Sequence, residues 1–177
     1  MSSIASSDSM GPTSSLTVSA RGDNLQIQED ILHRAADMHW PEGLDPTAAD
    51  MFVHNEILIQ APPEQIWQRL IDATSWPGWY SNARDVALNE PAQVLGECVT
   101  FEWTTYGFRI ASAVAEFVPY SRLGWFGTGE DLCAYHTWLL VDLGERTHIV
   151  MEELQLGGGA KRLAETNPGQ MHRGHDL

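Results

Sequence analysis

Residues 52–80 constrain the fold of this chain more than any other segment. The first part mostly alternates apolar and polar side chains, as a strand with one face on a core does. The pair Pro62-Pro63 ends this strand, because proline cannot donate a hydrogen bond to a neighbouring strand. In residues 63–72 the apolar side chains recur at helical spacing. The segment therefore predicts a strand that is followed directly by a short amphipathic helix.

An aromatic turn comes next, with the sequence Ser75-Trp76-Pro77-Gly78-Trp79-Tyr80. Proline and glycine break the helix at this point. Three large rings in one turn present more apolar area than water covers favourably, so they must pack on something. We therefore expect this turn to form the roof of a pocket.

Six further segments have strand character and are separated by turn residues. They cover residues 84–88, 97–104, 108–118, 123–126, 133–141 and 147–156. With the first strand they predict an antiparallel sheet of about seven strands. Such a sheet needs a helix to cover one face, and the last helical signal begins at Asn167-Pro168. The predicted class is α+β, with a curved sheet around a C-terminal helix and short helices after the first strand.

The N-terminal part differs in composition from the rest of the chain. Residues 1–22 are rich in serine and lack a sustained apolar period, which predicts a disordered tail. Residues 23–50 predict a helix and a linker, with the helix capped by Asp23 or Asn24 and ending near Trp40. The main domain is then expected over residues 51–177.

Composition and charge exclude several classes of protein. With 177 residues and 43% hydrophobic content, the chain can fill one core but not two. Its 10 basic and 24 acidic residues give a net charge of −14, which repels nucleic acids and anionic membrane surfaces. No apolar run approaches the roughly 18 residues that cross a bilayer. We therefore expect a cytoplasmic protein that binds no nucleic acid and does not insert into membranes.

The order of these motifs resembles the START-like, or SRPBCC, superfamily, and within it the polyketide cyclase/dehydrase-type proteins. Residues 59–72 have the pattern I-x-A-P-x-E-x-I-W-x-x-L-x-D, and residues 76–80 have W-P-x-W-Y. Later agreement comes from Val118-Pro119, residues 122–125, residues 135–140, Glu152-Glu153 and residues 169–177. The resemblance covers about residues 51–177 and implies a helix-grip fold, which in this superfamily serves carriers, receptors and cyclases alike.

The predicted C-terminal helix is shorter than the resemblance implies, because the sequence ends about ten residues into it. Two interpretations stay open. Either the sequence is truncated, or the concave face of the sheet is covered in another way. A homodimer or the N-terminal helix could provide that cover.

A curved sheet around a helix leaves an apolar wedge that suits a small hydrophobic ligand. His136 and Trp138 share one face of their strand, and the resemblance places this face inward. If the turn after this strand keeps an even register, Glu152 lies on the same side and raises the basicity of His136. We therefore expect His136 and Glu152 to be a catalytic acid/base pair. A core histidine without a catalytic role stays open, and another register would turn Glu153 inward instead.

Other residues are candidates for ligand contact. The rings of Tyr80, Trp103, Trp125 and Trp138 would stack on the ligand, Arg109 would bind an anionic group, and His172 would donate a hydrogen bond. A surface salt bridge is the alternative for Arg109. His172 and His175 share a helix face but lack further ligands at suitable spacing, so no metal is expected. No dinucleotide motif or nucleophile elbow is present, and no cofactor is expected.

These observations predict a domain that binds a small hydrophobic molecule of aromatic or polyketide type in a central cavity. In the enzymatic version a lyase or isomerase of secondary metabolism catalyses an acid/base cyclisation or dehydration. The alternative is a carrier of lipids or small molecules without catalysis, or a protein-interaction module.

Overall fold

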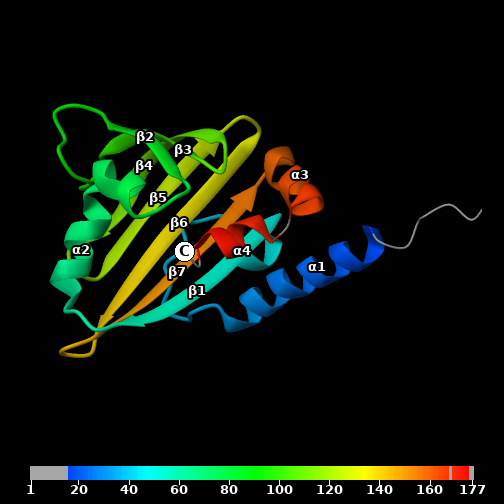
Figure 1. Ribbon diagram of the computed structural model, residues 1–177, viewed down its shortest axis with the longest axis horizontal. Helices are drawn as coiled ribbons and strands as arrows, with labels where there is room; N and C mark the ends of the chain where they lie inside the picture. Colours follow the sequence, from blue (N-terminus) through cyan, green and yellow to red (C-terminus); the bar gives the residue numbers. More distant parts are fainter. Residues whose placement is uncertain (1–15, 168, 176–177) are drawn as a thin grey trace, which may run out of the picture.

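Seven antiparallel strands form one sheet in the computed structural model, which describes residues 16–167 and 169–175. Along the sheet the order of strands is β1, β7, β6, β5, β4, β3, β2. Their bounds are β1 Met51–Ile59, β2 Ala83–Leu88, β3 Thr100–Thr105, β4 Phe108–Val118, β5 Arg122–Gly129, β6 Leu132–Asp142 and β7 Thr147–Leu156. The predicted α+β class and the helix-grip arrangement are confirmed (Figure 1).

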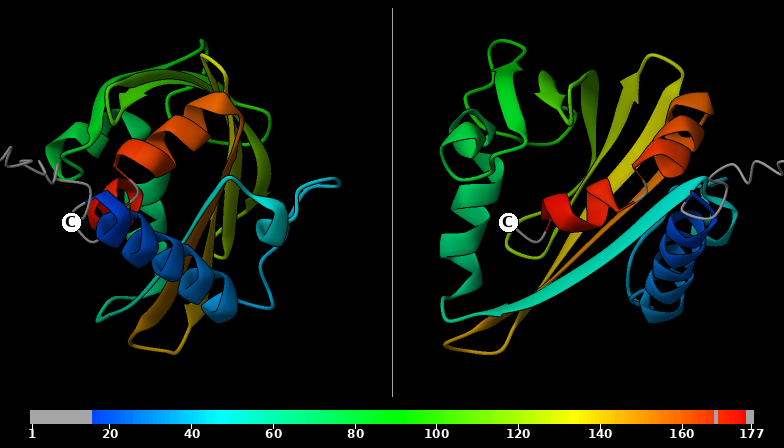
Figure 2. Two further views of the ribbon diagram at one scale, coloured as in Figure 1. Left: turned by 90° about the vertical axis from the view of Figure 1, so that its right-hand side faces the viewer. Right: turned by 45° about the vertical axis from the view of Figure 1, so that its right-hand side comes forward.

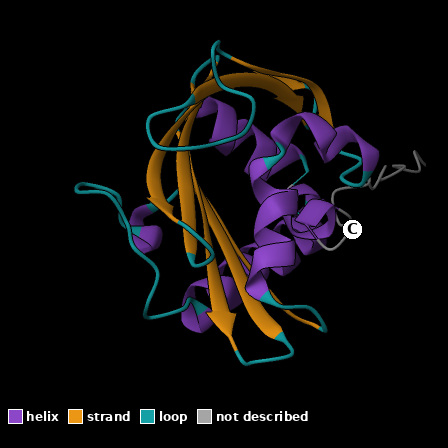
Figure 3. Cartoon of the chain, turned by 90° about the vertical axis from the view of Figure 1, so that its left-hand side faces the viewer, coloured by secondary structure: helices purple, strands orange, loops and turns teal. Residues whose placement is uncertain are grey.

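The strand order explains why helices cover the hollow side of the sheet. β2 to β7 are each joined to a neighbour, whereas β1 and β2 lie at opposite edges. The chain must therefore cross the sheet between β1 and β2. It does so through α2 (Pro63–Ile71) and the 3₁₀ helix η2 (Ala73–Gly78), the predicted helix and aromatic turn. The sheet bends around this helical layer (Figure 3).

The main core lies between the hollow face of the sheet and these crossing elements. Trp67 and Leu70 of α2 and Trp76 of η2 are buried against the inner side chains of the sheet. Trp67 packs edge-on against Phe117, with ring centroids 5.2 Å apart. Because apolar area removed from water stabilises by about 25 cal/mol per Å², these large side chains hold α2 in place.

Two short helices end the described chain, α3 (Gly158–Thr166) and α4 (Gln170–His175). The C-terminal helix was predicted, whereas α3 has no counterpart in the sequence analysis. Gly157 precedes α3 with a φ of 112°, and Gly159 N donates to the carbonyl of Asp131 at 2.8 Å. A Cβ at position 157 would collide with that carbonyl. Glycine thus lets α3 begin directly against the turn between β5 and β6.

The N-terminal helix α1 spans Leu16–His33, so it begins and ends earlier than the sequence analysis expected. Residues 1–15 of the predicted disordered tail lie outside the described residues. Ile27 and Ile31 of α1 pack with Trp40 on the outer face of the sheet, over Phe52 and Tyr135. Figure 2 shows α4 inside the curve of the sheet and α1 along the outside of β1. No described helix combines the length and apolar character that crossing a membrane requires.

We predict that Trp67→Ala lowers the free energy of unfolding by about 3–5 kcal/mol, because the side chain is 2% exposed and its loss leaves a cavity. The control is Trp79→Ala, which removes a ring that is 43% exposed and should cost less than about 1 kcal/mol. Urea unfolding measures both values. Equal losses in the two variants would contradict this account of the core.

Candidate functional site

A cleft of about 650 Å³ lies between the hollow face of the sheet, α2, η2 and α4. Most of its wall is apolar. The aromatic rings that line it are Trp76, Trp79, Tyr80, Trp103, Trp125 and Trp138. Four of these rings, Tyr80, Trp103, Trp125 and Trp138, were predicted to contact a ligand. The structure brings these four together in one cavity.

Buried rings form the floor of the cleft. The centroid of Trp76 lies 5.3 Å from that of Trp103 and 5.6 Å from that of Trp125. The indole nitrogen of Trp103 has a hydrogen-bond partner within the protein, because its Nε1 donates to Ser112 Oγ at 3.1 Å. Trp138 is only partly buried, and Trp79 is exposed. These two rings therefore have apolar surface left for a ligand.

His136 lies between two of the tryptophans. Its ring stacks on Trp125 with a centroid distance of 4.5 Å and on Trp138 with a distance of 5.4 Å. Nδ1 of His136 is 2.9 Å from Oε2 of Glu153, and among the described residues Nε2 has no hydrogen-bond partner. The side chain is 8% exposed. Packing and the Glu153 contact thus hold the ring in one orientation.

Glu153 is the carboxylate on the inner face of β7. Gln155 Nε2 donates to its Oε1 at 2.8 Å. Burial acts to raise the pKa of Glu153, but the hydrogen bond and charge of His136, with His175 and Gln155, outweigh it and lower the pKa below its usual value. Glu153 is therefore a buried, ionised group, and it lines a smaller cavity of about 40 Å³ that shares His136 and His175 with the cleft.

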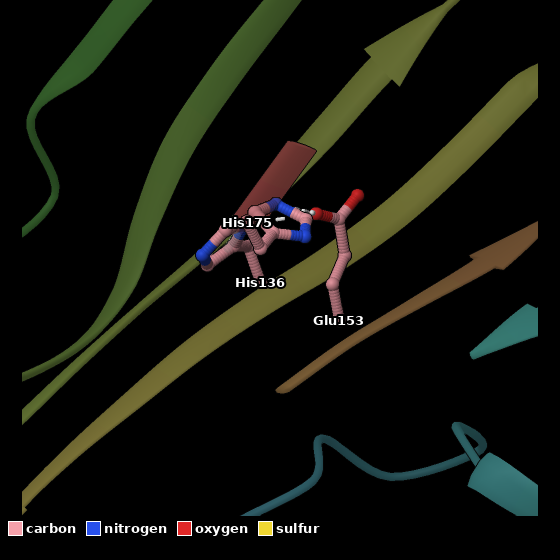
Figure 4. Close-up of side chains that lie close together, drawn as sticks. All are labelled: His136, Glu153 and His175. Carbon is pink, nitrogen blue, oxygen red and sulfur yellow. Dashed lines mark hydrogen bonds and ion pairs between the residues drawn. The ribbon is translucent and has the colours of Figure 1, made fainter. Parts of the chain in front are cut away.

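His175 comes from α4 and lies next to Glu153, so that His136, Glu153 and His175 form one cluster. Its Nε2 lies 3.7 Å from Oε2 of Glu153 (Figure 4). The His175 ring stacks on Tyr80 at 6.3 Å and meets Tyr106 edge-on at 6.0 Å. Burial lowers the pKa of His175 to about 4, because the cationic form is poorly solvated there. His175 is thus a neutral imidazole at pH 7.

Two tyrosines support this end of the cleft. Tyr80 donates from its hydroxyl to the hydroxyl of Tyr106 at 3.2 Å, and Tyr106 donates to the carbonyl of Met171 in α4 at 3.4 Å. Burial raises the pKa of Tyr80 to about 12, so its hydroxyl stays protonated. Gly174 approaches Tyr106 so closely that a Cβ there would collide with the hydroxyl. This close approach seats α4, and with it His175, against the cleft.

The structure corrects the predicted pairing of His136 with Glu152. In the β6–β7 pair His136 lies opposite Glu153, because the four residues 143–146 separate the paired Asp142 and Thr147. Such a turn places even-numbered residues of β6 and odd-numbered residues of β7 on the same face. Glu152 therefore points to the outer face.

On the outer face Glu152 is fully buried. Its Oε1 accepts hydrogen bonds from Ala35 N at 2.6 Å and from His54 Nδ1 at 2.8 Å. This carboxylate ties the segment after α1 to strand β1. It has no path to the cleft, because the sheet lies between them.

Two further predicted residues lie outside the cleft lining. The Arg109 side chain is 80% exposed and forms an ion pair with Glu102, which is the surface salt bridge left open by the sequence. His172 is on α4, but its Nδ1 lies 3.5 Å from Oδ2 of Asp30 in α1. Neither residue is among those that line the cleft.

Glu153 and His175 are the site residues that sequence reasoning did not select. The sequence analysis mentioned Glu153 only as the residue that another strand register would turn inward. The length of the turn after β6 was the feature that could have identified it. His175 was considered only together with His172. The two side chains diverge, since His175 turns to the cleft and His172 to Asp30.

Comparison with solved structures identifies the fold. The aromatase/cyclase Zhui from Streptomyces sp. R1128 aligns with a TM-score of 0.57 at 13% identity, over 70% of this chain and 87% of that one. A START superfamily protein from Mycobacterium smegmatis aligns with a TM-score of 0.52 at 14% identity, over 71% and 94%. The chain thus has the START-like fold that its sequence resembles.

One relative is similar in sequence as well. The hypothetical protein jhp0584 from Helicobacter pylori shares 30% identity with a TM-score of 0.72, over 81% of this chain and 92% of that one. The chain belongs to one family with this protein. A scan against family models found no match, and a search of curated proteins found none.

The His54–Glu152 pair predicts a pH dependence of stability. The hydrogen bond to Glu152 raises the pKa of His54 above 6.5, despite burial. A raised pKa in the folded state stabilises below the unfolded pKa, and this contribution is lost as pH rises through the folded pKa. We therefore expect the stability difference between wild type and His54→Gln to be larger at about pH 5.5 than at about pH 8.5.

Urea unfolding at several pH values measures this difference. Glu152→Gln removes the partner of His54 and should flatten the same pH dependence. A difference that is constant, or that grows with pH, would contradict the assignment.

Proposed function

We propose that this protein binds a small, largely apolar molecule of aromatic or polyketide type in the cleft. One observation carries the proposal, namely an apolar cleft of about 650 Å³ that His136 and His175 line, with the buried carboxylate of Glu153 next to both rings. This volume is within the range of about 300–1,000 Å³ that is usual for small-molecule sites. Apolar walls with a few converging polar groups are the usual composition of such sites.

The arrangement of the cleft supports one orientation of the ligand. Its ring system would stack on Trp138, which is partly buried and has surface left to cover. A carbonyl or phenol oxygen would then lie at the inner end, near His136 and His175. The name of the Streptomyces relative, an aromatase/cyclase, agrees with this class of ligand.

We further propose acid/base catalysis by His136, with Glu153 in the role that the sequence analysis gave to Glu152. His136 would take a proton from the activated carbon of a ketone. The resulting enolate carbon would attack a second ketone of the same molecule, and the alkoxide would receive the proton back. Glu153 orients the His136 ring through its contact with Nδ1. Such a reaction is a cyclisation, and loss of water would complete a dehydration.

Ligand binding is tested by titrating the protein with a hydroxyanthraquinone and following tryptophan fluorescence. We expect Trp138→Ala to weaken binding by about threefold to tenfold, because one ring contact is worth roughly 0.5–1.5 kcal/mol. Trp40→Ala removes a tryptophan from the outer face and should leave the affinity unchanged. Saturable binding that responds equally to both variants, or no binding at all, would refute the proposed site.

Catalysis is tested by turnover of poly-β-ketone substrates. We expect Glu153→Gln and His136→Ala to lower kcat on the order of a hundredfold or more. The matched control is Glu152→Gln, which makes the same change at the adjacent residue on the opposite face and should keep the wild-type rate. Equal rates in wild type and His136→Ala would remove His136 from the mechanism.

A carrier without catalysis is the alternative outcome of these experiments. Mass spectrometry of material extracted from the purified protein separates the two functions. An intact aromatic or lipid-like molecule that the protein binds but does not convert would indicate transport. Product formation from a poly-β-ketone would indicate catalysis.

A further inference from the structure

Three side chains at the inner end of the cleft have the chemistry of a metal site. One nitrogen each of His136 and His175 and one oxygen of Glu153 lie within 4.8 Å of one another. They come from β6, α4 and β7, so elements far apart in the sequence bring them together (Figure 4). The fold thus places two imidazoles and a carboxylate around one point.

The separations between these atoms suit a common metal ion. Oε2 of Glu153 is 2.9 Å from Nδ1 of His136 and 3.7 Å from Nε2 of His175. Zinc binds nitrogen and oxygen at about 2.0–2.2 Å, so tetrahedral ligands lie about 3.3 Å from each other. Small rotations of the side chains would bring these atoms to that spacing.

The groups around the cluster hold the three candidate ligands in place. Gln155 binds the second oxygen of Glu153, and two tryptophans enclose the ring of His136. Neighbouring groups that orient metal ligands in this way are typical of metal sites in proteins. The His136 side chain is also buried, being 8% exposed.

We propose that His136, Glu153 and His175 bind one divalent transition-metal ion of the Zn²⁺ class. Two histidines and a glutamate are a ligand set of zinc sites that keep a further position open for water or substrate. Space for that position exists, because the cleft and a smaller cavity of about 40 Å³ both border the cluster. The sequence analysis expected no metal, since it lacked the ligands that β6 and β7 provide.

This inference goes beyond the proposed function, because an ion can bind whether or not an organic molecule occupies the cleft. If both bind, the open position would face the ligand oxygen at the inner end. The ion would then polarise that oxygen as a Lewis acid. The metal test below uses no organic ligand, so the two proposals can fail separately.

The test is the binding of Co²⁺, as a coloured substitute for Zn²⁺, to full-length protein that has been treated with a chelator. We expect about one Co²⁺ per chain by equilibrium dialysis, visible absorption of a coordinated ion, and loss of that absorption when Zn²⁺ is added. Absence of saturable Co²⁺ and Zn²⁺ binding by the wild-type protein would overturn the proposal.

Substitutions in the cluster test which residues bind the ion. His175→Gln and Glu153→Gln should each weaken Co²⁺ binding by more than about tenfold. His148→Gln is the matched control, because it removes a histidine that pairs with Glu56 at the surface, outside the cluster. Wild-type binding that persists in both cluster variants would place the ion elsewhere and overturn the assignment. Circular dichroism of each variant establishes that it is folded, and the result for the wild-type protein does not depend on the variants.

A titration of the metal-free protein with the hydroxyanthraquinone separates this proposal from the proposed function. Organic binding without any metal binding refutes only the metal site. Metal binding without organic binding refutes only the proposed function.

Discussion

The pairing of β6 with β7 is the constraint on which the site depends. Because His136 lies opposite Glu153, the imidazole and the carboxylate share the hollow face of the sheet. The same register sends Glu152 to the outer face, where it binds the segment after α1. A shift of the β6–β7 register by one residue would move Glu152 to the hollow face and Glu153 to the outer face, and the contacts of both carboxylates would be lost. One turn therefore decides which acid belongs to the cleft and which holds the N-terminal segment.

Burial gives the cluster its chemical character. An ionised carboxylate inside an apolar cleft is costly unless nearby groups compensate for the lost water. His136 and Gln155 supply hydrogen bonds to Glu153, and His175 supplies a neutral ring 3.7 Å away. Stacked tryptophans and tyrosines exclude water from the same groups. Proton transfer and metal binding both profit from such an enclosed and oriented set of side chains, and the proposed experiments distinguish these two uses.

Much of the fold could be predicted from local patterns. The first strand, the helix that begins at Pro63 and the aromatic turn have periodicity and breakers that leave few alternatives, and the later strands have turn residues between them. α3 escaped prediction because its glycines are poor helix formers, and they are tolerated through close packing on Asp131. The bounds of α1 also differed. Within the site, His136 and the aromatic rings could be selected by alternation along their strands, whereas Glu153 and His175 could not.

By itself the sequence determined which residues form the strands, α2 and the aromatic turn, since proline, glycine and apolar periodicity act over a few neighbours. It also determined that aromatic rings would face a hollow, because so much apolar area must leave water. Only the tertiary structure decided the partners of His136. Register depends on the exact conformation of one turn, and the position of His175 depends on how α4 packs against Tyr106. These are long-range contacts between distant segments, and no local pattern encodes them.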